Sequence, residues 1–183
     1  MTAKRRSAPA PDPFALPQSG LTLIEALVVL SIFALVVGGA LALFGSASTS
    51  QSTTQFTSDL NALRTSTKSL YFGQGGYGAN VPLNEVLING RKVPTTMTIS
   101  GTAPNRVINH SLNGQITITG INSQFTVQAT NIPTEVCIGL ASMNGWDLVK
   151  VGGAIAHPPP VTPSQASTDC ASASTQTIVF TGS

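Results

Sequence analysis

Between Leu21 and Phe44 the chain has 24 residues with a single charged side chain, Glu25, near the beginning. A helix of that length spans about 36 Å, which is sufficient to cross about 30 Å of hydrocarbon. The basic residues 4–6 precede this segment, and positive charge of this kind keeps the N-terminus in the cytoplasm. The pattern therefore predicts a membrane-spanning helix that sends the C-terminal part of the chain across the membrane.

The helical pattern continues beyond this apolar segment. One stripe of an α-helix is formed by residues at spacings of four and three, namely Phe56, Leu60, Leu63, Thr67 and Leu70. Polar residues off the stripe are expected to face solvent, and these are Asp59, Asn61, Arg64, Thr65 and Lys68. No proline occurs from Leu21 to Tyr71. The pattern predicts one helix of about 50 residues, apolar all round in its first half and amphipathic in its second.

Two weak points leave an alternative open. Gly38 and Gly39 are adjacent, and the stretch 45–54 is rich in Ser and Thr. Glycine costs about 1 kcal/mol in a helix interior, and Ser and Thr hydroxyls compete for backbone hydrogen bonds. The sequence therefore allows either one continuous helix or two helices with a boundary in this region.

Later stretches alternate between apolar and polar side chains. They are residues 96–100, 115–120 and 124–130. Alternation predicts strands with one buried and one wet face. Asn-Gly pairs at 89–90 and 113–114 predict hairpins over 85–93 and 111–120. The sequence thus predicts an α+β fold in which the amphipathic helix covers one face of an antiparallel sheet.

Turn and loop residues divide the rest of the chain. The glycine-rich stretch 71–78 is expected to end the long helix. The remaining predicted elements are a short helix opened by Pro133, a strand over 145–151, a proline-rich loop over 154–168 and a last strand over 175–182.

Composition argues against several classes of function. Residues 21–183 contain six basic and six acidic side chains, so we expect no nucleic-acid-binding patch. His110 and His157 are the only histidines, and no catalytic motif accompanies them, so we predict neither enzyme activity nor a cofactor. Cys137 and Cys170 do not form a CxxC pair, so no metal site is expected. Cytosolic cysteines usually stay reduced, whereas export of this part of the chain from the cytoplasm would favour a disulfide between Cys137 and Cys170.

The residues before the apolar segment make Glu25 unusual. A small, polar junction at 18–20 precedes the apolar part, whereas the cleavage site of an ordinary secretory signal follows it. A carboxylate within a bilayer costs a few kcal/mol and normally has a partner. Cleavage after Gly20 would create an α-ammonium on Leu21, one helical turn from Glu25 or close to the Glu25 of a neighbouring subunit. The alternative is that Glu25 lies among the cytoplasmic headgroups and has no role.

The sequence GLTLIE at residues 20–25, followed by the apolar segment, resembles the prepilin signature of type IV pilins and the related pseudopilins. The resemblance implies that a prepilin peptidase cuts between Gly20 and Leu21 and N-methylates Leu21. It implies that Glu25 registers each subunit against its neighbour in a filament. A leader of 20 residues and a first mature residue Leu21 resemble the type IVb branch, although residues 21–183 are short for that branch.

The resemblance also implies the pilin fold, a long N-terminal α-helical spine packed on an antiparallel β-sheet head. The implied parts are a leader peptide (1–20), a transmembrane and polymerisation half of the helix (21–44), an amphipathic half (45–72) and a head (73–183) whose exposed C-terminal loop is closed by a Cys137–Cys170 disulfide.

The implied function is that of a homo-oligomeric helical filament, a type IV pilus that serves adhesion, aggregation, motility or DNA transfer. Its precursor would reside in the inner membrane with the pilus assembly machinery, and the assembled pilus would be extracellular. Two alternatives stay open. One is a minor pilin or a type II secretion pseudopilin, and the other is a membrane-anchored binding domain that keeps the segment and never assembles.

Overall fold

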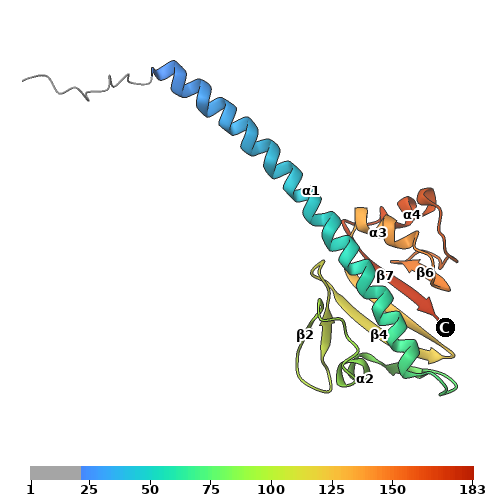
Figure 1. Cartoon of the computed structure of the whole chain (residues 1–183). Helices are drawn as coiled ribbons and strands as arrows, with labels where there is room; N and C mark the ends of the chain where they lie inside the picture. Colours follow the sequence, from blue (N-terminus) through green and yellow to red (C-terminus); the bar gives the residue numbers. More distant parts are fainter. Residues whose placement is uncertain (1–21) are drawn as a thin grey trace, which may run out of the picture. The chain divides into compact units, whose positions relative to one another are not determined.

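A computed structural model describes residues 22–183, apart from the side chains of residues 42–49. The chain divides into two compact units, Met1–Gly45 and Ser46–Ser183. Helix α1 extends over 48 residues, Leu23–Leu70, and contributes to both units (Figure 1). The prediction of one continuous helix is confirmed, and the alternative of two helices is wrong. The predicted leader lies outside the described residues.

The C-terminal unit is built on one seven-stranded sheet with the strand order β2-β3-β4-β5-β7-β6, in which β1 also pairs with β4. All of its strand pairs are antiparallel. The strands are β1 (Gly78–Pro82), β2 (Thr98–Ser100), β3 (Val107–Asn109), β4 (Gln115–Asn122), β5 (Gln124–Pro133), β6 (Leu148–Val151) and β7 (Thr175–Gly182). The short helices are α2 (Asn84–Asn89), α3 (Thr134–Ala141) and α4 (Pro163–Cys170).

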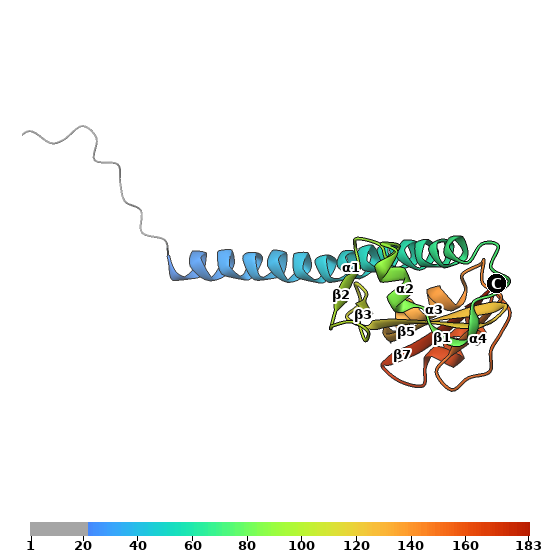
Figure 2. The ribbon, with the colours of Figure 1, turned by 90° about the horizontal axis from the view of Figure 1, so that it is seen from below.

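One face of this sheet is buried, and the second half of α1 lies across it (Figure 2). The register aligns Ile118, Val127, Phe180 and Val149 on neighbouring strands, and all four side chains are buried. The helix contributes the predicted stripe, of which four residues are fully buried and Leu70 is half-buried. Helix and sheet therefore share one hydrophobic core, as the alternation and the helical stripe predict.

Several predicted strands and turns are confirmed. The β3–β4 hairpin is confirmed, but its turn covers residues 110–114 instead of the Asn-Gly pair alone, and Asn113 within it has a positive φ of 59°. Buried and exposed residues alternate along β4 and through most of β5. In the stretch 96–100, Met97 is buried as the alternation predicts, but Ile99 is exposed, because the strand β2 that contains it lies at the edge of the sheet and is exposed at all three residues.

The predicted hairpin over residues 85–93 is wrong, because α2 occupies this stretch. Leu87 and Ile88 are consecutive and both buried, whereas a strand would point them to opposite faces. Gly90 has φ −73° and caps the helix, so the Asn-Gly pair does not form a hairpin turn. An Asn-Gly pair predicts a hairpin only when the flanking residues alternate.

The predicted proline-rich loop is also partly wrong, because α4 begins within it at Pro163. The side chain of Thr162 accepts a hydrogen bond from the backbone N–H of Gln165 at 3.4 Å and caps the helix. Proline at the first helical position costs nothing, since that N–H has no helical partner. The short helix α3, the strand β6 and the last strand β7 are confirmed.

Candidate functional site

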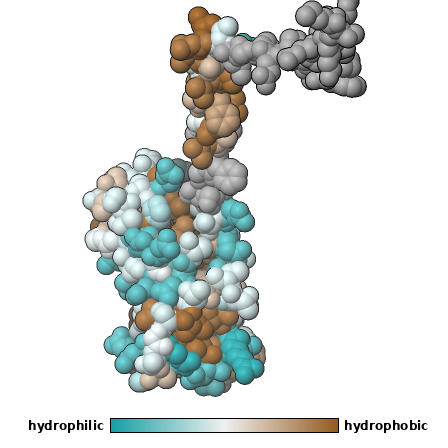
Figure 3. Space-filling model, turned by 90° about the vertical axis from the view of Figure 1, so that its left-hand side faces the viewer, coloured by the Kyte–Doolittle hydropathy of each residue, from teal (hydrophilic) through white to brown (hydrophobic). Residues whose placement is uncertain are grey.

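The described part of the N-terminal unit is a helix that is apolar on all sides. Leu23–Leu41 is long and apolar enough to cross a membrane, and none of this stretch is buried. Leu23 is 80% exposed and Leu35 is 77% exposed. The space-filling view in Figure 3 shows the hydrophobic surface along this segment. An exposed apolar surface of this length needs lipid or protein partners to cover it.

Glu25 lies in the first turn of α1, at the start of this apolar surface. Its backbone N–H donates a hydrogen bond of 3.4 Å to the side-chain oxygen of Thr22. The spacing of Thr22 and Glu25 is that of a capping box, and an acidic side chain is favourable at the positive end of the helix dipole. The first basic residue after Glu25 is Arg64, so no basic side chain between residues 22 and 63 can neutralise it. The expected cleavage site, Gly20 and Leu21, lies outside the described residues.

Two residues of α1 that were expected to face solvent pack against the head instead. Asp59 is buried, and its Oδ1 accepts hydrogen bonds from Gln55 Nε2 at 3.0 Å and from Thr96 Oγ1 at 2.7 Å. Arg64 is half-buried, with its guanidinium carbon 5.4 Å from the centre of the Trp146 ring. Both residues flank the buried stripe, where side chains from distant loops reach them. Helical periodicity cannot reveal such partners.

The cysteines form a disulfide that joins α3 to α4. Cys137 and Cys170 are both fully buried, with their Cα atoms 6.0 Å apart. Within the loop that they close, His157 Nε2 lies 3.5 Å from Asp169 Oδ2, and the backbone of His157 pairs with Val149 of β6. The loop is therefore attached to the sheet as well as closed by the bond.

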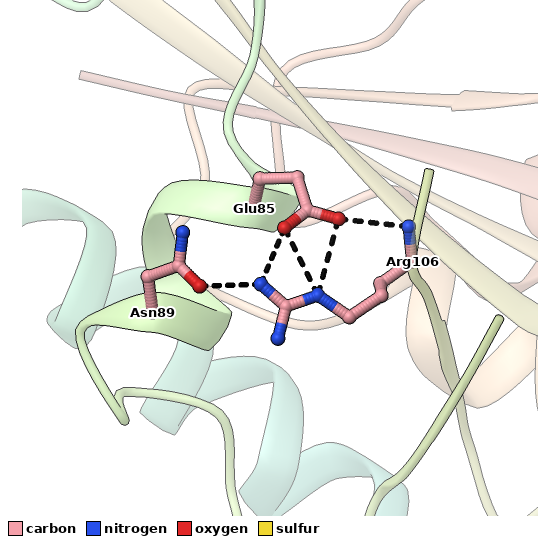
Figure 4. A network of polar contacts seen from close by, with 3 residues as sticks. All are labelled: Glu85, Asn89 and Arg106. Atoms are coloured by element: carbon pink, nitrogen blue, oxygen red, sulfur yellow. Dashed lines mark hydrogen bonds and ion pairs between the residues drawn. The ribbon is translucent and has the colours of Figure 1, made fainter. Parts of the chain in front are cut away.

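A polar network attaches α2 to the sheet (Figure 4). Glu85 accepts hydrogen bonds from the backbone N–H of Arg106 at 2.8 Å and from Arg106 Nε at 3.0 Å, and Arg106 also donates to Asn89. The hydrogen bonds from Arg106 lower the pKa of the Glu85 carboxyl below its usual value. Asn84 adds two hydrogen bonds to the backbone of β4. These contacts explain why this stretch folds as a helix against the sheet.

The described residues contain no cluster of three His, Cys, Asp or Glu side chains that could hold a metal ion. The family model described as PilS N terminal matches residues 50–183. The chain belongs to the PilS family. A second model, the prokaryotic N-terminal methylation motif, matches residues 16–41 of this PilS-family chain. Together these matches confirm the resemblance to the type IV pilin superfamily.

The PilS-family chain is similar to solved pilins. The crystal structure of type IV b pilin from Salmonella typhi has 25% sequence identity and a TM-score of 0.56, and the match covers 67% of this chain and 96% of that one. The structure of TcpA, a type IV pilin from Vibrio cholerae El Tor biotype, has 16% identity and a TM-score of 0.47, with 73% of this chain and 99% of that one covered. No curated protein sequence matches significantly. The match to the type IV b pilin confirms the pilin fold of this PilS-family chain, and in this similarity the chain is type IVb-like.

Proposed function

We propose that this PilS-family chain is the structural subunit of a type IV pilus. It is made as an inner-membrane precursor, cut between Gly20 and Leu21, methylated on Leu21 and assembled into an extracellular helical filament. The observation that carries the proposal is the N-terminal methylation motif at residues 16–41. This motif overlaps the exposed apolar helix surface of Leu23–Leu41, in which Glu25 is the single charged side chain.

The charge of Glu25 gives the cleavage a physical purpose. Residues 22–63 contain no basic side chain that could neutralise the Glu25 carboxylate, and a carboxylate in an apolar surrounding costs a few kcal/mol. Cleavage would place an ammonium group on Leu21. In a filament, the ammonium of one subunit and the Glu25 carboxylate of the next would neutralise each other away from water. Only subunits in the correct register would make this pair, so it would select the position of each incoming copy.

The apolar first half of α1, which lies outside the core of the head, supports the same proposal. The buried stripe of α1 begins at Phe56, and from there onward α1 fills the core of the head. The apolar stretch Leu23–Leu41 takes no part in that core. In the membrane, lipid would cover this stretch, and in the filament other copies of α1 would replace the lipid.

Co-expression of the full chain with a prepilin peptidase tests the processing step. Intact-mass measurement is expected to show the loss of residues 1–20 and the gain of one methyl group. Gly20→Val, which adds bulk at the cut, is the blocked control and is expected to keep its leader. An unchanged mass of the wild-type chain would contradict the proposal and favour a membrane-anchored binding domain that never assembles.

The runner-up function is that of a minor pilin or pseudopilin, which would share the cleavage and the methylation. The Cys137–Cys170 disulfide favours a pilin over the main pseudopilin. Electron microscopy of material sheared from cells separates the two, since a major subunit is expected to form long pili. Absence of this chain from such pili would favour the runner-up.

A further inference from the structure

His110 is a buried histidine in the five-residue turn between β3 and β4. Its Nε2 lies 3.0 Å from the carbonyl oxygen of Thr130 on β5, so Nε2 carries the proton and donates it. Its Nδ1 accepts a hydrogen bond of 3.3 Å from the backbone N–H of Leu112. The two contacts together require the neutral ring with the proton on Nε2, because a second proton on Nδ1 would face the N–H of Leu112.

The same turn is attached to α1. The His110 ring is 4.5 Å from the ring of fully buried Phe56, measured between centroids. Ser111 Oγ donates a hydrogen bond of 3.3 Å to the backbone carbonyl of Ser52. At Gly114 an added Cβ would lie 1.9 Å from the Thr130 oxygen and 2.5 Å from His110 Nε2, so the turn has no spare room. His110 therefore lies where the turn, β5 and α1 meet.

No charged group is placed to neutralise a proton on this ring. Strands β4 and β5 carry no titratable side chain. On α1, Asp59 is hydrogen-bonded to Gln55 and Thr96, and Arg64 and Lys68 lie further along the helix. Glu135 stands at the start of α3, after β5. None of these groups forms an ion pair with His110 in the described part of the chain.

We propose that His110 is an acid-sensitive latch that holds the β3–β4 turn on α1. A proton on Nδ1 removes the acceptor of the Leu112 N–H and places a positive charge against Phe56. The turn then swings out, breaks the Ser111–Ser52 hydrogen bond and exposes the charged ring to water. The head thereby loosens from α1 at residues 52–56. This inference does not depend on the proposed pilus function.

The direction of the pH effect follows from the burial of the ring. Burial lowers the pKa of His110 below the ordinary value of 6.5. The opened turn then binds the proton more readily than the closed turn, so acid favours opening. The latch is fully closed above the ordinary pKa and weakens as the pH falls below it. Between the ordinary pKa of the opened turn and the lowered pKa of the closed turn, the ratio of opened to closed protein rises about tenfold for each unit by which the pH falls.

Amide hydrogen exchange on the full chain in detergent tests the latch, with rates corrected for the pH dependence of intrinsic exchange. The Leu112 amide of the wild-type chain is expected to lose protection about tenfold for each pH unit from 6.5 down to the lowered pKa of His110, and to level off below it. In His110→Gln, whose side chain can donate to Thr130 but cannot be charged, the protection is expected to be independent of pH. His157→Gln, which removes the other histidine, is the matched control and is expected to keep the wild-type slope.

A flat wild-type profile, or a slope that persists in His110→Gln, would overturn the latch. If His110→Gln fails to fold, the test passes to the wild-type chain, in which NMR follows the His110 ring through its titration. A pKa at or above 6.5 would overturn the proposal, and a lower pKa that coincides with faster exchange at Leu112 would support it.

Discussion

Leu60→Ala is the sharpest test of how the head depends on α1. The Leu60 side chain is completely buried in the middle of the stripe that α1 packs on the sheet. Its truncation loses the burial of the removed methyl groups and leaves a cavity, and for a fully enclosed leucine the two together cost about 3–5 kcal/mol. The head is expected to have a total stability of about 5–15 kcal/mol, so the loss is a large part of it.

Urea unfolding of the full chain in detergent measures this loss through the fluorescence of Trp146, the one tryptophan. Trp146 reports on the core because its ring lies 5.1 Å from that of Phe180. With a slope of about 2 kcal/mol/M, the midpoint is expected to fall by about 1.5–2.5 M. The matched control Asn61→Ala changes the exposed neighbour on the same helix and is expected to stay within about 0.5 kcal/mol. A Leu60→Ala midpoint equal to that of Asn61→Ala would refute the packing described here.

Three further outcomes are expected from urea unfolding of the same chain. Replacing Cys137 and Cys170 together by serine should cost about 3–4 kcal/mol, because the disulfide closes a loop with a sequence separation of 33; an unchanged midpoint would contradict this. Gly114→Ala should destabilise the head by at least about 1–3 kcal/mol, because the added Cβ meets the backbone oxygen of Thr130. Its control Gly139→Ala, which has open space inside α3, should stabilise the head by about 0.5–1 kcal/mol. Equal effects of the two substitutions would contradict the tight packing of the turn. Glu85→Gln should lower stability at pH 7, and the difference from the wild type should vanish as the pH falls through the lowered pKa of Glu85; a difference that persists in acid would argue against the ion pair.

Sequence periodicity predicted the parts of the fold that depend on local pattern. The stripe from Phe56 to Leu70 follows the helical repeat, and the alternation in β4 follows the strand repeat, so both reveal which face is buried. Strand β1 was not predicted, because all of its residues are exposed and so show no alternation; its pairing with β4 depends on backbone hydrogen bonds. The cap formed by Thr162 before Pro163 was visible in the sequence and would have predicted α4.

The errors at polar positions have another cause. Asp59 and Arg64 lie off the apolar stripe, and only the folded head brings Thr96 and Trp146 to them. Likewise, α2 owes its helical state to contacts with Arg106, which is 21 positions from Glu85. No local pattern around His110 reveals that its ring packs on Phe56, which is 54 positions earlier in the chain. Such long-range contacts are not encoded in local periodicity.

The assembly claim depends on the carboxylate of Glu25, and filament formation by Glu25→Gln tests it most directly. Glu135→Gln is the matched control, since it removes an exposed acid from the first turn of α3. In cells that express the peptidase and the assembly machinery, both variants are expected to lose residues 1–20, and only Glu135→Gln is expected to appear in sheared pili at the wild-type level. Sheared pili that contain Glu25→Gln as abundantly as the wild-type chain would contradict the account.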